Sequence, residues 1–207
     1  MNRSDLKEVE YESLLRRIVP ILLDNGLKSS TMDVVAASLG ISKRTLYEIF
    51  ESKKVMISEA LSALNRQNQE FISHTFATSD NVMEALVAIF KHNRDLMGKV
   101  NVEFYRDMDR LYKENREDYD RAKEKRNEGM LQMFRRGVEQ GMFRPDVDYG
   151  VQSRIIGLQM EAFKRIEEFF PPDMSIKRVF DAIIVGFLRS IASPKGMEIL
   201  DRLTKEL

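Results

Sequence analysis

Apolar side chains recur every three or four residues along most of the chain, the spacing that places them on one face of a helix. The first such stripe lies on a helix predicted over 5–25 and comprises Leu14, Leu15, Ile18, Val19, Leu22 and Leu23. Comparable patterns predict helices over about 30–39, 43–50, 53–76, 81–98, 101–114, 116–140, 148–169, 175–193 and 194–207. The expected fold class is therefore all-α.

Pro20 interrupts the first apolar stripe. Its ring nitrogen carries no hydrogen for the carbonyl of Arg16, so one helical hydrogen bond is lost. The sequence therefore predicts either a kink at this point or a shorter helix restarted near Val19. Asn25 and Gly26 are expected to end the element.

The stretch 30–50 contains two short helical patterns joined by a turn. Ser30 is of a type preferred as a helix N-cap, and we expect it to cap the first helix. The apolar face of this helix is assigned to Val34, Val35 and Leu39. Gly40 follows the last periodic residue and suits a left-handed C-cap. Ser42 can then cap a second helix that begins at Lys43.

Two helices joined by so few residues must cross at a large angle and touch closely. Ala36 meets this requirement, because its small side chain lies four residues before Gly40 on the inner face. The surrounding apolar contacts are expected from Val35, Leu39, Ile41, Leu46 and Ile49. The spacing as a whole predicts a helix-turn-helix.

The outward side of the second helix begins with Lys43, Arg44 and Thr45. In helix-turn-helix proteins this first turn meets base edges in the major groove of DNA. A guanidinium can bind O6 and N7 of guanine together, so Arg44 is the strongest candidate for base recognition. The alternative is that these residues form a solvated helix start without a binding role.

Several residues in the stretch from about Leu14 to Leu61 match the motif of a known protein family. The matching positions are Gly26, Ser30, Thr31, Gly40, Ile41, Ser42, Thr45, Leu46, Tyr47, Phe50, Ser52 and Lys53. With these residues the stretch resembles the DNA-binding domain of tetracycline-repressor (TetR) family transcription regulators. Where that family often has glycine before Thr-Leu-Tyr, this chain has Arg44, so the family's base preferences do not transfer.

The resemblance implies a set of DNA contacts and an architecture. It implies phosphate contacts from Thr31, Tyr47 and Lys53, and base or backbone contacts from Ser42, Lys43, Arg44 and Thr45. It also implies an all-helical dimer whose C-terminal domain binds a small effector. We therefore expect residues 1–53 to form the helix-turn-helix DNA-binding domain and residues 54–207 to form a helical effector-binding and dimerisation domain.

Composition narrows the class of protein. The formal net charge is +0, so the expectation of nucleic acid depends on the local basic patch from Lys43 to Lys54. The chain contains no Cys, which excludes disulfides and thiolate chemistry and fits a reducing compartment. No apolar run reaches about 20 residues, and the first residues are too charged for a signal peptide. We expect a cytoplasmic protein without a membrane segment.

The last two long helices, 148–169 and 175–193, carry apolar residues on more than one face. Such helices need cover on several sides. The resemblance implies that the equivalent pair of a second subunit provides it, which predicts a homodimer. The alternative is that both helices fill the core of a large monomer.

Soft and aromatic side chains are frequent on the helices between 81 and 169, where they could line a cavity for an apolar ligand. The predicted effector-site residues are Phe90, His92, Met97, Phe104, Met108, Met133, Phe134, Gln159 and Phe163, with Arg94 as a further polar candidate. The alternative for these positions is ordinary core packing. His92 and Asp95 lie one helical turn apart, but two ligands are too few for a metal site, so no metal is expected.

The motifs of enzymes are missing from the sequence: it has no Gly-rich phosphate loop, no His-Glu-x-x-His and no serine elbow. We therefore expect neither an enzyme nor a cofactor. The leading interpretation is a ligand-responsive transcriptional repressor that binds a near-palindromic operator as a dimer. One alternative is a DNA-binding protein of the same fold without an effector, which acts through DNA architecture or a protein partner. Another is an all-helical binding or catalytic module whose helix-turn-helix is vestigial and does not bind DNA.

Overall fold

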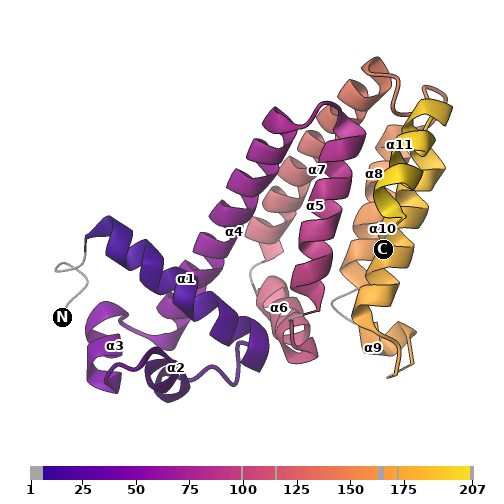
Figure 1. Cartoon of the computed structure of the whole chain (residues 1–207). Helices are drawn as coiled ribbons and strands as arrows, with labels where there is room; N and C mark the ends of the chain where they lie inside the picture. The colour runs from indigo at the N-terminus through magenta and orange to yellow at the C-terminus, as the bar shows by residue number, and fades with distance from the viewer. Residues whose placement is uncertain (1–6, 99, 115, 163–165, 172, 206–207) are drawn as a thin grey trace. The chain divides into compact units, whose positions relative to one another are not determined.

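The computed structural model describes residues 7–98, 100–114, 116–162, 166–171 and 173–205, and these residues are almost entirely helical (Figure 1). The helices are α1 (Glu8–Asn25), α2 (Met32–Leu39), α3 (Lys43–Ile49), α4 (Lys53–Thr78), α5 (Val82–Met97), α6 (Val102–Glu114), α7 (Arg116–Glu139), α8 (Tyr149–Ala162), α9 (Ile166–Phe169), α10 (Ile176–Ile191) and α11 (Pro194–Thr204). Within the described residues, strand-like pairing is limited to an isolated bridge between Phe143 and Ala192. The all-α prediction is confirmed.

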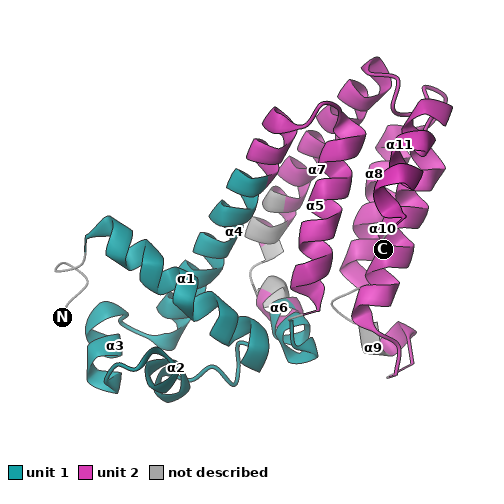
Figure 2. Ribbon diagram, in the orientation of Figure 1, with its two compact units in different colours: residues 1–71, 99–108 teal, residues 72–98, 109–207 magenta. Residues whose placement is uncertain are grey.

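The chain forms two compact units (Figure 2). Unit 1 comprises Met1–Phe71 and Lys99–Met108, and unit 2 comprises Ile72–Gly98 and Asp109–Leu207. Helices α4 and α6 each begin in unit 1 and end in unit 2. The functional division predicted between residues 53 and 54 stays a prediction.

The core of unit 1 is built on the apolar face of α1. Its buried residues are Leu14, Leu15, Ile18, Val19 and Leu22, in agreement with the predicted stripe. This face packs against α2, and α2 packs against α3. Phe50, Met56 and Ala60 complete the core from the α3–α4 connection and the first turns of α4. The helix-turn-helix thus has a third helix covering its apolar back.

Helix α1 runs without interruption through Pro20. The alternative of a shorter helix restarted near Val19 is therefore wrong. The side chain of Pro20 is exposed, so its ring lies away from the buried face and the packed stripe is kept on both sides of it. The kink stays a prediction.

Unit 2 has its own hydrophobic core, in which α5 packs against α7, α10 and α11. The buried members of this core are Val82, Met83, Val87, Phe134, Met142, Phe143, Leu188, Ile191, Ala192 and Leu200. Phe134 is its aromatic centre, because its ring contacts those of Phe143, Tyr149 and Phe187. Within the helix predicted over 148–169, the structure describes α8 and α9, while 163–165 lie outside the described residues.

Candidate nucleic-acid interface

The observed N-cap of α2, the first helix of the helix-turn-helix, lies one residue after the predicted cap. Thr31 caps α2, because its Oγ1 accepts the backbone N–H of Val34 at 3.3 Å. Ser30 is fully buried, and its Oγ donates to the carbonyl oxygen of Gly26 at 2.7 Å. The prediction that Ser30 caps the helix is wrong, because its hydroxyl satisfies a carbonyl inside the α1–α2 turn instead.

The turn between α2 and α3 has the predicted geometry. Gly40 has φ 71° and ψ 28°, the left-handed conformation that glycine adopts without strain. The N–H groups of Gly40 and Ile41 donate to the carbonyls of Ala37 and Ala36 at 3.1 and 3.0 Å. Ser42 then caps α3, because its Oγ accepts the N–H of Thr45 at 3.0 Å. Both capping predictions are confirmed.

The inner faces of α2 and α3 are closely packed. Val35, Ala36, Leu39, Leu46 and Ile49 are all buried, and Ile41 is half-buried. Val34 is an exception to the predicted apolar face, since it is 37% exposed. Val34 lies three residues after the cap Thr31, in the first turn of α2. The C-terminal end of α2 is bound to α1, because Nη2 of Arg17 donates to the carbonyl oxygen of Leu39 at 3.0 Å.

The outer face of α3 carries exposed cations in its first turn. The side chain of Arg44 is 89% exposed, and its Nε donates to Oε1 of Glu48 at 3.0 Å. The Nζ of Lys43 lies 2.8 Å from Oδ2 of Asp33 on α2. The hydrogen bond to this carboxylate raises the pKa of Lys43, which favours the charged ammonium further. Tyr47 is exposed on the same short helix.

The other predicted phosphate contacts lie at two more helix starts. Thr31 is exposed at the start of α2. Lys53 is the first residue of α4, and its Nζ donates to the carbonyl oxygen of Lys28 at 2.6 Å. Ser52 accepts the N–H of Val55 at 3.3 Å in the first turn of α4. Free N–H groups at helix N-termini suit phosphate oxygens, so the arrangement can bind a DNA backbone as well as read bases.

The acidic partners of these cations were not predicted as site residues. Glu48 follows Arg44 by four residues, a spacing that allows an ion pair on one helix. The sequence therefore contained a signal for that contact. Asp33 and Lys43 lie on different helices, so their pairing depends on the crossing of α2 and α3 and has no local signal.

Known proteins resemble this chain in both sequence and structure. No family model matches the chain. The HTH-type transcriptional repressor KstR2 of Mycolicibacterium smegmatis is 28% identical over 156 residues, which are 70% of this chain and 73% of the relative. The TetR-family regulator PfmR of Thermus thermophilus has a solved structure that is 25% identical, with a TM-score of 0.54, over 85% of this chain and 97% of PfmR. In sequence and in fold, this chain is therefore similar to TetR-family and other helix-turn-helix transcriptional regulators.

A further solved structure has a similar fold. The structure of the ketosteroid transcriptional regulator KstR2 of Mycobacterium tuberculosis has a TM-score of 0.59 and 21% identity. The match covers 91% of this chain and 97% of that one. The similar proteins are regulators rather than enzymes.

The predicted effector-site residues of this protein lie in several environments. Phe104 and Met108 belong to unit 1, where Phe104 is buried against Tyr105. In unit 2, Phe90 is buried and stacks on Phe180, and Phe134 is the aromatic centre of the core. His92, Met97 and Met133 are half-buried, and Phe163 lies outside the described residues. Their role in binding an effector stays a prediction.

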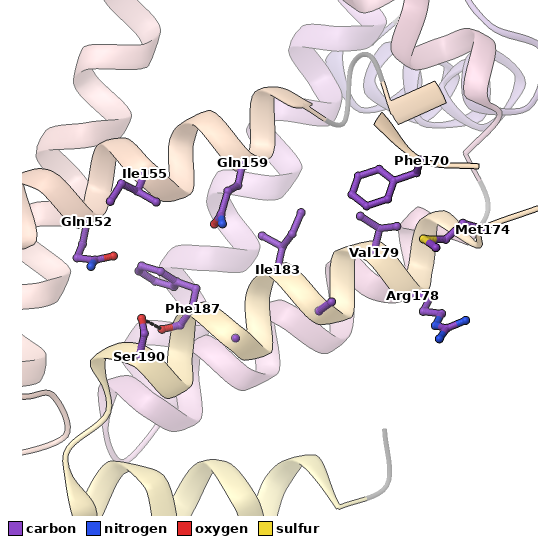
Figure 3. Close-up of a pocket in the computed structure, with 12 residues that line it drawn as sticks. Gln152, Ile155, Gln159, Phe170, Met174, Arg178, Val179, Ile183, Phe187 and Ser190 are labelled. Atoms are coloured by element: carbon purple, nitrogen blue, oxygen red, sulfur yellow. Dashed lines mark hydrogen bonds between the residues drawn. The ribbon is translucent and has the colours of Figure 1, made fainter. Parts of the chain in front are cut away.

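The polar candidates differ in their surroundings. The guanidinium of Arg94 forms an ion pair with Asp181, with Nε and Oδ1 2.7 Å apart. This contact joins α5 to α10 and gives Arg94 a structural role. Gln159 lines a groove of about 540 Å³ between α8 and α10, in which Ile183 and Phe187 project from the facing helix (Figure 3).

The two helices that form the groove of unit 2 carry apolar side chains, several of which remain open to solvent. On α8, Leu158 is 66% exposed, and Val151 and Ile155 are exposed as well. On α10, the lining residues Val179, Ile183 and Phe187 follow one another at four-residue spacing. Exposed apolar surface of this kind marks interaction sites in proteins.

The described residues contain neither a membrane-spanning helix nor a cluster of metal ligands. None of their helices is long and apolar enough to cross a membrane. No group of three or more His, Cys, Asp or Glu side chains is arranged to hold a metal ion within this part of the chain.

Proposed function

We propose that this protein is a dimeric repressor of the TetR family that binds a near-palindromic operator through α3 and leaves it when a small apolar effector binds. The observation that carries the proposal is the division of α3 into two faces. Leu46 and Ile49 are buried on the side of α3 that packs against α2, whereas Lys43 and Arg44 extend into solvent from the first turn. A short helix held in this way fits the major groove, which admits one α-helix.

The proposed contacts divide into two classes. Arg44 reads a guanine through O6 and N7, with Lys43 and Thr45 on neighbouring bases. Ser42 lies at the same helix start and contacts bases or the sugar-phosphate backbone. The exposed residues Thr31 and Tyr47, together with Lys53, bind phosphates and fix the register of α3.

The proposed dimer forms through α8 and α10. The exposed Val151, Ile155 and Leu158, with the groove between the two helices, provide an apolar surface that a second copy can cover. Burial of each such side chain contributes about 1.5–3 kcal/mol. The same two helices of both subunits would form a four-helix interface, and the two α3 helices would then enter half-sites about 34 Å apart.

The proposed effector acts by changing the separation of the two α3 helices. Helices α4 and α6 continue from unit 1 into unit 2, so a ligand bound to unit 2 can move unit 1, which carries α3, through these two helices. The half-buried His92, Met97 and Met133 are the proposed effector residues in unit 2, and thioether side chains adapt to apolar ligands of varied shape. The protein would act in the cytoplasm and without enzymatic activity or a cofactor.

Selection of bound sequences from random duplex DNA tests this proposal. The full chain is expected to enrich one near-palindromic motif, and addition of an apolar fraction of a metabolite extract is expected to abolish the enrichment. A water-soluble fraction of the same extract serves as the control. Failure to enrich any motif would overturn the proposal of DNA reading. Enrichment that no extract fraction changes would instead favour a DNA-binding protein without an effector.

A further inference from the structure

The first turns of α6 are attached to the α1–α2 turn within unit 1. The N–H of Asn101 donates to the carbonyl of Leu23 at 2.9 Å, just before α6 begins. Farther along α6, Oδ2 of Asp107 accepts the backbone N–H of Lys28 at 2.7 Å. Asp107 is 9% exposed, so the carboxylate side of this part-buried contact is largely shielded from water. A carboxylate that accepts a backbone N–H in such surroundings makes a strong hydrogen bond.

Gly26 permits the close approach of α6 to this turn. Its φ is 77°, a conformation that other residues rarely adopt. A Cβ placed on Gly26 would lie 3.1 Å from Cβ of Glu103 and 3.2 Å from Oδ2 of Asp107. The turn and α6 are therefore fitted to each other at a position where a larger residue would move the carboxylate.

The same turn also binds the start of α4. The carbonyl oxygen of Lys28 accepts Nζ of Lys53 at 2.6 Å. Both backbone polar groups of Lys28 are thus used, one by a carboxylate on α6 and the other by an ammonium on α4. An ammonium carries three N–H donors, so a bond to this carbonyl leaves donors of Lys53 for a DNA phosphate.

We propose that Asp107 is a positioning residue for DNA binding, an inference that rests on the proposed function. It holds the backbone of Lys28, and Lys28 in turn directs the ammonium of Lys53 toward the DNA backbone. The second segment of unit 1 ends at Met108, so Asp107 lies close to the point on α6 where unit 1 ends and unit 2 begins. A displacement of α6 would break the contact to Lys28 and loosen the phosphate contact of Lys53.

A double-mutant cycle on DNA binding tests this role. The probe is the duplex recovered by selection, with a scrambled duplex for comparison, and affinity is measured over a range of salt concentrations. Asp107→Ala is expected to weaken binding to both duplexes by about tenfold, as for the loss of one charge-assisted phosphate contact. The slope of log affinity against log salt should fall by about 1, as for Lys53→Ala. The double variant should bind no more weakly than either single variant.

Two further substitutions of Asp107 distinguish a positioning role in DNA binding from an effect on folding. Asp107→Asn keeps a carbonyl oxygen that can accept the N–H of Lys28, so it should retain most of the affinity and the full salt slope. Asp107→Ser is too short to reach that N–H, and it decides the outcome if Asp107→Ala does not fold. Additive losses in the cycle, or an unchanged salt slope, would overturn the inference. A wild-type chain that binds no duplex would instead refute the proposed function.

Discussion

Arg44 and Glu48 lie one turn apart on α3, and Nε of the arginine donates to the glutamate at 3.0 Å. The bond uses Nε, the inner nitrogen of the guanidinium, and does not require the two terminal nitrogens. These are the atoms that would meet O6 and N7 of a guanine. An exposed ion pair of this kind stabilises a helix by only about 0.3–0.5 kcal/mol, so its main effect is on the direction of Arg44.

The packing of α3 predicts a large effect of a substitution on its inner face. Leu46 is fully buried, and Leu46→Ala should lower the free energy of unfolding by about 2–5 kcal/mol, because it leaves a cavity beneath the helix. Val34→Ala on the exposed side of α2 is the control, with an expected change within about 0.5 kcal/mol. Chemical denaturation measures both. Equal effects of the two substitutions would show that α3 is not packed in this way.

The exposed apolar surface of α8 predicts a homodimer that one charge can separate. Leu158→Glu should shift the protein from dimer to monomer, because a carboxylate buried in an apolar interface loses its hydration. Arg135→Glu places the same side chain on the exposed surface of α7 and should leave the dimer intact. Sedimentation velocity separates the two species. A dimer that survives Leu158→Glu would place the interface elsewhere.

The burial of Tyr105 predicts a loss of stability at alkaline pH. Desolvation raises the pKa of Tyr105 from 10.0 to about 12, so the neutral phenol is favoured in the folded state. This contribution is complete below pH 10 and is lost as the pH rises toward 12, because the unfolded chain ionises first. Between about pH 9 and pH 11.5, the free energy of unfolding should fall by about 1–2 kcal/mol more in the wild type than in Tyr105→Phe. Parallel pH profiles of the two proteins would contradict the assignment.

The helix-turn-helix could be predicted from sequence because its determinants are local. Gly40 and Ser42 occupy adjoining caps, and Ala36 lies one turn before the glycine, so each residue supports the same geometry. The cap of α2 was misplaced by one residue because Ser30 and Thr31 are both good caps. The choice between them is made by the α1–α2 turn, which draws Ser30 inward.

Other features depend on contacts that no local pattern records. Asp107 and Lys28 are 79 positions apart, and their hydrogen bond exists only because α6 returns to the α1–α2 turn. The effector site is equally hard to predict from local sequence. Helical spacing indicates that Phe90 and Phe134 are buried, which they are, but it does not indicate whether a buried face borders a ligand or other side chains.

The most direct test of DNA reading by α3 compares the base preferences of the wild type, Arg44→Ala and Lys53→Ala. Each protein is measured against the selected duplex and against its single-base variants at one salt concentration. Arg44→Ala should reduce discrimination at one base pair in each half-site by about 1–3 kcal/mol, whereas Lys53→Ala should weaken all duplexes alike. If Arg44→Ala retained the wild-type preference at every position, the assignment of base recognition to the outer face of α3 would be wrong.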